Sequence, residues 1–150
     1  MSWLGSVVAP IRMTEISLPQ DAPPVVGIID PNPVARERLR GLLQGVGVEV
    51  QVATFDSAED YLLAAADKNF ACLIVDLLLP GMSGLEFLRR LRSAGNDIPL
   101  VLLADESDVP TAVAAMREGA TDFIEKPYAN VAILKQVHKL LLGKNTPARA

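Results

Sequence analysis

Short apolar runs alternate with amphipathic segments along most of the chain. Five runs, rich in β-branched residues, predict strands. The segments between and after them repeat apolar residues every three or four positions, which predicts five helices. We expect strands at 25–30, 48–53, 71–76, 98–103 and 121–124, and helix starts at Asn32-Pro33, Asp56 with Glu59, Ser83 with Glu86, Asp108-Val109-Pro110 and Asn130.

Strict alternation of strands and helices predicts an α/β fold. Five strands joined by helices favour a doubly wound, five-stranded parallel sheet with helices on both faces. We expect the flavodoxin-like strand order 2-1-3-4-5, with five helices. In that order the carboxyl ends of the first and third strands meet at the topological switch, where ligands of such sheets bind.

The two ends of the chain lack this periodicity. Residues 1–24 carry Pro10, Pro19, Pro23 and Pro24, and we interpret them as a flexible leader. Residues 143–150 are polar and are predicted to form a short tail. One domain is therefore expected at residues 25–142.

Composition narrows the class of protein. Hydrophobic residues make up 50% and charged residues 21% of the 150, which is typical of a packed globule. The net charge of -4 argues against a nucleic-acid surface, and no apolar run reaches the roughly 20 residues of a membrane span. The single cysteine, Cys72, lies within an apolar run and is expected to be buried in a reducing compartment, the cytoplasm.

Three ionisable residues end predicted strands. Asp30 ends the first strand, Asp76 ends the third, and Lys126 lies just after the fifth. Because the carboxyl ends of parallel strands lie at one edge of a sheet, we expect these side chains to share a crevice.

This set of residues resembles the receiver domain of two-component response regulators. Each motif is weak alone, but the motifs occur in order on five strand–helix units. They are Ile28-Ile29-Asp30, Val75-Asp76, the segment 79–86, Asp108-Val109-Pro110, Gly119-Ala120 and the segment 122–127.

The resemblance implies a phosphorelay function. Asp76 would accept a phosphoryl group from a histidine kinase or phosphotransfer protein and form an aspartyl phosphate, with Lys126 contacting a phosphoryl oxygen. It also implies a cis peptide before Pro127. The expected protein is a stand-alone receiver that signals to a downstream protein partner and is not itself an enzyme.

Two positions depart from the pattern of the family. The resemblance implies a Mg²⁺ site made of Asp30, Asp76 and the backbone carbonyl of Leu78, but Pro31 stands where the family has a second acidic ligand. We therefore expect weak Mg²⁺ binding. Asn32 could replace the ligand or cap the following helix.

The second departure is Ala104, where the family has threonine or serine. The missing hydroxyl normally couples the phosphoryl group to a buried aromatic residue, which Phe123 matches. Asp105 and Glu106 follow directly and add negative charge, which disfavours an incoming dianion.

Other interpretations remain open. Pro31 and Ala104 also fit a pseudo-receiver, an interaction module that works without phosphorylation. A flavodoxin-like cofactor binder is disfavoured, because the loop after the first strand is acidic and proline-rich where a phosphate cradle needs glycine. Arg36, Arg38 and Arg40 lie on the first helix, which the resemblance implies is the kinase-docking helix. We favour a solvated helix face with Glu37 as partner.

The last two helices offer a candidate partner surface. Val131 and Leu142 lie outside the apolar stripe of the last helix. The face between the fourth and fifth predicted helices is thus a candidate contact for a partner or a homodimer.

Overall fold

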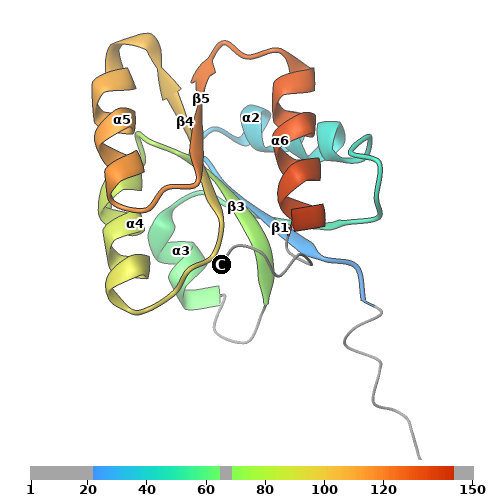
Figure 1. The fold of residues 1–150 in the computed structure, drawn as a ribbon, viewed down its shortest axis with the longest axis horizontal. Helices are drawn as coiled ribbons and strands as arrows, with labels where there is room; N and C mark the ends of the chain where they lie inside the picture. Colours follow the sequence, from blue (N-terminus) through green and yellow to red (C-terminus); the bar gives the residue numbers. More distant parts are fainter. Residues whose placement is uncertain (1–21, 65–68, 144–150) are drawn as a thin grey trace, which may run out of the picture.

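The computed structural model describes residues 22–64 and 69–143. Five parallel strands form one sheet in the order β2-β1-β3-β4-β5, which confirms the predicted order. Figure 1 shows the sheet edge-on between two layers of helices. The strands are β1 (Val25–Ile29), β2 (Gln51–Phe55), β3 (Phe70–Asp76), β4 (Leu100–Asp105) and β5 (Asp122–Lys126).

Helices cover both faces of the sheet, so the fold is doubly wound as predicted. They are α2 (Pro33–Leu43), α3 (Ala58–Ala64), α4 (Gly84–Ser93), α5 (Val109–Arg117) and α6 (Asn130–Gly143), with a 3-10 turn, η2 (Glu106–Asp108), before α5. Buried residues of α3, α4 and α5 form one core cluster, and those of α2 and α6 form the other. The central strand β3 is buried along its whole length.

Some strand boundaries differ from the prediction. β2 starts at Gln51 rather than at residue 48, because Val48 and Val50 pack against the core of α2 and α6 without entering the sheet. β4 starts at Leu100 rather than at residue 98, because Pro99 has no N–H to donate to the sheet. β5 extends to Lys126, two residues beyond the predicted end.

Two of the predicted side-chain caps are confirmed, whereas Asp108 precedes α5 without a side-chain cap bond and Asn130 is the first residue of α6. Asn32 accepts from the N–H groups of Val34 and Ala35, and Ser83 and Glu86 form a reciprocal capping box. The prediction of Asp56 with Glu59 is wrong. α3 begins at Ala58, and the hydroxyl of Ser57 accepts from the N–H of Asp60 at 3.0 Å.

The predicted leader and tail lie almost wholly outside the described residues, so they stay predictions. Within residues 22–64 and 69–143, no helix is both long and apolar enough to cross a lipid bilayer.

Candidate functional site

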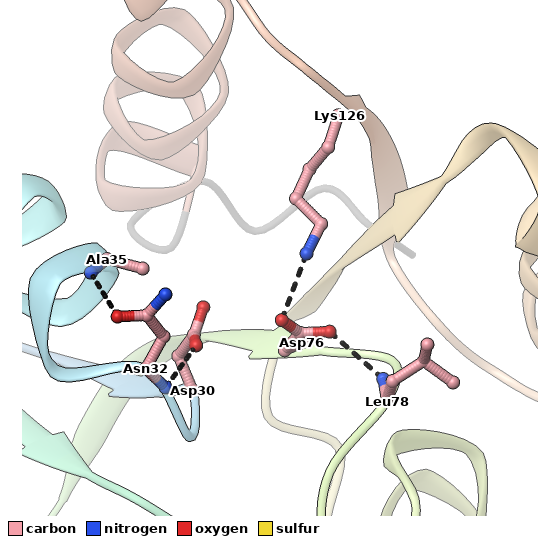
Figure 2. A network of polar contacts seen from close by, with 6 residues as sticks. All are labelled: Asp30, Asn32, Ala35, Asp76, Leu78 and Lys126. Atoms are coloured by element: carbon pink, nitrogen blue, oxygen red, sulfur yellow. Dashed lines mark hydrogen bonds and ion pairs between the residues drawn. The ribbon is translucent and has the colours of Figure 1, made fainter.

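Three charged side chains meet at the carboxyl edge of the sheet. Asp30 follows β1, while Asp76 and Lys126 are the last residues of β3 and β5. Figure 2 shows the two carboxylates beside each other, with the Lys126 ammonium approaching Asp76 from β5. The backbones of Asp30 and Asp76 leave the sheet here, and both residues are buried, with 4% and 7% of their surface exposed.

Asp76 has a partner on each carboxylate oxygen. Lys126 Nζ donates to Oδ2 at 3.0 Å, and the backbone N–H of Leu78 donates to Oδ1 at 3.0 Å. The first contact is an ion pair and the second fixes the orientation of the carboxylate. The orientation of the Asp76 carboxylate is therefore fixed, and Lys126 neutralises its charge at Oδ2.

Asp30 is tied to the loop that follows it. Its Oδ1 accepts from the N–H of Asn32 at 2.9 Å, and its backbone carbonyl accepts from Arg36 Nη1 at 2.7 Å. Burial raises the pKa of Asp30 above its usual range, the Asn32 hydrogen bond opposes this, and the charge of Asp76 raises it further. Asp30 is thus a carboxylate that a nearby cation would stabilise.

Lys126 responds to these carboxylates. Burial alone would lower the pKa of its ammonium group. The hydrogen bond and charge of Asp76, with the charges of Asp105 and Asp30, outweigh burial, so the pKa of Lys126 is raised. The ammonium therefore stays protonated at neutral pH, as neutralising a phosphoryl oxygen requires.

The loop after β3 is packed closely against the start of α4 and the end of β3. A Cβ on Gly84 would lie 2.8 Å from the carbonyl oxygen of Asp76 and 2.9 Å from Leu77 Cα, so only glycine fits where α4 begins. Gly81 has a φ of 69°, in the left-handed region. Glu59 reaches from α3 and accepts from the N–H of Met82 at 2.8 Å. This contact replaces the capping role that was expected for Glu59.

The residues present offer Mg²⁺ two carboxylates. Pro31 contributes no side-chain oxygen, and Asn32 Oδ1 is engaged with the N–H groups of Val34 and Ala35 at 2.8 and 3.4 Å. Asn32 is therefore the helix cap of the two roles considered for it. Within the described ranges, no group of three or more His, Cys, Asp and Glu side chains is placed to hold a metal ion. Asp30 and Asp76 fit a hard cation whose other ligands are backbone oxygen and water.

The crevice contains residues that the sequence analysis did not assign to it. It is a cavity of about 400 Å³. The side chain of Arg38 lies in its wall, with the guanidinium carbon 5.4 Å from the ring centre of Tyr128. Its lining residues are Asp30, Pro31, Asn32, Ala35, Arg38, Asp76, Leu103, Asp105, Lys126, Pro127 and Tyr128.

The expectation of a solvated arginine face on α2 with Glu37 as a partner holds in part. Arg38 is exposed and Arg40 pairs with Glu37 at 3.3 Å, but Arg36 and Arg40 are half-buried. Arg36 binds the Asp30 carbonyl, and Arg40 donates to the carbonyl of Val52 at 3.3 Å. A signal for Arg38 was present in the sequence. It lies three residues after Ala35, hence on the same side of the helix, and Ala35 also lines the crevice.

Ala104 and Phe123 lie away from this cavity. Ala104 is buried in the core cluster under α3, α4 and α5, and Phe123 packs against the same cluster. Leu103 and Asp105, the neighbours of Ala104 in β4, line the crevice instead, because successive side chains of a strand point to opposite faces. The Lys126–Pro127 peptide is cis, as the resemblance implied.

Comparison with known proteins places this geometry in a family. Residues 26–138 match the response regulator receiver domain. The C4-dicarboxylate transport transcriptional regulatory protein DctD of Pseudomonas aeruginosa is 39% identical over 123 residues, which are 82% of this chain and 26% of that protein. The transcriptional regulatory protein FixJ of Azorhizobium caulinodans is 37% identical over 124 residues, which are 83% of this chain and 57% of that protein.

Solved structures agree with the sequence matches. Full-length FixJ from B. japonicum superposes with a TM-score of 0.76 at 30% identity, over 84% of this chain and 61% of that one. A response regulator receiver protein from Pseudoalteromonas atlantica superposes with a TM-score of 0.73 at 33% identity, over 80% of this chain and 98% of that one. The crevice at the carboxyl edge of an order 2-1-3-4-5 sheet and these matches lead to one conclusion: the chain belongs to the response regulator receiver domain family of two-component systems.

Proposed function

We propose that Asp76 is the phosphoacceptor of this receiver domain. The observation that carries the proposal is the placement of Asp76, a buried strand-end carboxylate with Lys126 Nζ 3.0 Å away and a cavity of about 400 Å³ open before it. A carboxylate is a competent nucleophile towards phosphorus. Asp30 lacks such a lysine partner and is tied to its own loop, so it is the weaker candidate.

The transfer is a displacement at phosphorus. A carboxylate oxygen of Asp76 forms the new bond to phosphorus, while the bond from phosphorus to the donor nitrogen breaks. The leaving imidazole of the donor histidine keeps the electron pair of that bond and takes up a proton. Such transfers need positioning and charge neutralisation more than covalent help, and the protein's own contribution is Lys126 and the N–H of Leu78.

Receiver domains of this family generally bind Mg²⁺ at the phosphorylation site. For this chain we propose that Asp30, Asp76 and the backbone carbonyl of Leu78 hold Mg²⁺ weakly, since Pro31 removes one carboxylate. When bound, Mg²⁺ supplies positive charge to the phosphoryl oxygens.

We further propose that the domain acts through protein contacts rather than as an enzyme with a substrate of its own. A histidine kinase or phosphotransfer protein would supply the phosphoryl group, and the exposed apolar residues of α5 and α6 would meet a downstream partner or a second copy of the chain. Val113 on α5 and Val131 on α6 are 44% and 65% exposed. The matched residues cover only 26% and 57% of the length of the two regulators named above. We therefore do not assign the output functions of those proteins to this chain.

Electrophoresis in gels that retard phosphoproteins tests the assignment. The protein is incubated with acetyl phosphate and Mg²⁺, and wild type is compared with Asp76→Asn and Asp30→Asn. We expect a shifted band in wild type that is lost in acid and alkali, and no shifted band in Asp76→Asn. A shifted band that persists in Asp76→Asn, or one that withstands acid, would refute Asp76 as the acceptor.

A second candidate function is a pseudo-receiver, and a specific observation favours it. Ala104 offers no hydroxyl, and its side chain lies in the core with Phe123 instead of lining the crevice. A ligand shifts an equilibrium between two conformations only through its differential affinity for them. Phosphorylation here would therefore change the conformation of Phe123 little.

An NMR titration with Mg²⁺ and beryllofluoride separates the two candidates. A pseudo-receiver predicts weak Mg²⁺ binding and little change around Phe123 in wild type. The double variant Pro31→Asp with Ala104→Thr should bind Mg²⁺ more tightly and show larger shifts. Tight binding with large shifts in wild type would establish an ordinary phosphorylation switch.

A further inference from the structure

The three arginines of α2 have different partners. Arg36 donates to the carbonyl of Asp30, and Arg40 donates to Glu37, to the carbonyl of Val52 and to Thr54. The side chain of Arg38 makes no hydrogen bond or ion pair with the part of the chain that the structure describes, and its one contact of note is with the ring of Tyr128. Its five N–H donors therefore remain available to a ligand.

Arg38 also lies where an anion would be received. It lines the same cavity as Lys126 and Asp76, on the side of the crevice formed by α2. Three carboxylates line this cavity, those of Asp30, Asp76 and Asp105, against two cations, Lys126 and Arg38. The lining thus carries a formal charge of -1, and a phosphoryl group would add about -1.5 to -2 more. Each cation in the wall is then needed for neutralisation.

Tyr128 holds the guanidinium in place. The Arg38 Cζ atom lies 5.4 Å from its ring centre, within cation–π range. Burial raises the pKa of the Tyr128 phenol, and the charges of Arg38, Asp30, Lys126 and Asp76 all act on it, consistent with a ring that faces the crevice. A guanidinium stacked on a ring keeps its N–H edges free for the bidentate contacts with phosphate that its planar shape favours.

We propose that Arg38, held by Tyr128, is a phosphate-contacting residue of this site. Where a receiver has an acidic residue in place of Pro31, that residue and its Mg²⁺ help to neutralise the phosphoryl group. In this chain Arg38 takes over part of that charge neutralisation. The inference rests on the proposed function of Asp76 for its biological meaning. It concerns the binding of the phosphate group itself, so it is measurable without the covalent step. Phosphate affinity should then depend strongly on Arg38 and only weakly on Mg²⁺.

The test is a titration of the full chain with inorganic phosphate, followed by the amide NMR signals of Leu78 and Lys126, in EDTA and again with Mg²⁺. Arg38→Gln is compared with Arg90→Gln, which removes the same charge from α4 outside the lining of this cavity. We expect Arg38→Gln to weaken phosphate binding about tenfold in EDTA, the usual effect of losing one charge-assisted contact. Arg90→Gln should stay within about twofold of wild type, and Arg38→Lys should recover part of the loss.

Several results would overturn the inference. Unchanged phosphate affinity in Arg38→Gln would do so, as would an equal loss in Arg90→Gln, because the effect would then be that of net charge. Absence of measurable phosphate binding by wild type would also overturn it. Thermal unfolding of each variant verifies that the fold is retained.

Acetyl phosphate labelling of the same variants separates this inference from the proposed function. Wild type that binds phosphate through Arg38 but is never phosphorylated would refute the phosphoacceptor role and leave the anion site standing. Wild type and Arg38→Gln that are phosphorylated at equal rates in EDTA and in Mg²⁺ would refute the role of Arg38 and leave Asp76 as acceptor.

Discussion

Replacing Lys126 with methionine removes the ammonium that pairs with Asp76 and keeps most of the aliphatic side chain. The two carboxylates at the sheet edge then face each other without this cation. At the observed 3.0 Å between Lys126 Nζ and Asp76 Oδ2, the Coulomb attraction is about 5–6 kcal/mol at an effective dielectric constant of about 20. Desolvation of both ions offsets most of it, because the Asp76 and Lys126 side chains are only 9% and 30% exposed.

The net coupling is best isolated by a double-mutant cycle. We expect Lys126→Met to stay folded and to lose about 2 kcal/mol of unfolding free energy, since it leaves buried carboxylates unpaired. Asp76→Asn should be near neutral or stabilising, because it removes the repulsion with Asp30. The coupling free energy of Lys126 with Asp76 should then be about 1–3 kcal/mol.

Urea unfolding at about pH 7, followed by far-ultraviolet circular dichroism, measures all four corners of the cycle. The whole cycle is repeated at high salt, which should change the coupling little because the pair is largely shielded from solvent. A coupling below about 0.5 kcal/mol would refute the reasoning, since the ion pair would then contribute no more than an exposed one. A Lys126→Met variant more stable than wild type would refute it as well.

Other regions of the molecule allow further tests. The raised pKa of Asp30 means that the native state binds its proton more tightly than the unfolded chain, so stability falls as pH rises above the ordinary value of 3.8. Asp30→Asn should therefore be about 1 kcal/mol more stable than wild type at pH 7, with the difference vanishing below about pH 4 in urea unfolding. Glu59→Ala should speed amide exchange at Met82, which loses its acceptor, and cost about 1 kcal/mol or less. Val131→Glu should lower self-association in light scattering, whereas Leu63→Glu, at a still more exposed position on α3, should not.

The part of the site that could be predicted from the sequence consists of the residues at strand ends. Asp30 and Asp76 each close an apolar run, and Lys126 lies just beyond the predicted fifth strand. Parallel strands bring such ends together whatever the details of packing. The strand order and the doubly wound fold followed from the alternation of two periodicities.

Contacts between distant elements were harder to predict. Glu59 matched a capping pattern, yet it binds the Met82 N–H 23 residues away, and sequence spacing carries no trace of that approach. Arg36 and Arg40 were interpreted as solvated because charges on a helix are usually exposed. Arg40 does pair with Glu37, but both long side chains are half-buried and also reach backbone carbonyls at the ends and edges of strands. Only the packing of α2 on the sheet decides those contacts.

The loop from Asp30 to Pro33 also bears on any attempt to restore an acidic ligand at position 31. Two prolines fix φ on either side of Asn32, which itself has the extended conformation (ψ of 115°) that a following proline favours. The unfolded chain gains little freedom in such a segment, so an aspartate at position 31 would cost about 0.4–1 kcal/mol in chain entropy before any metal is bound. A substitution that tightens Mg²⁺ binding at this position therefore also makes the loop less rigid. Its gain in binding free energy must exceed the stability lost with Pro31.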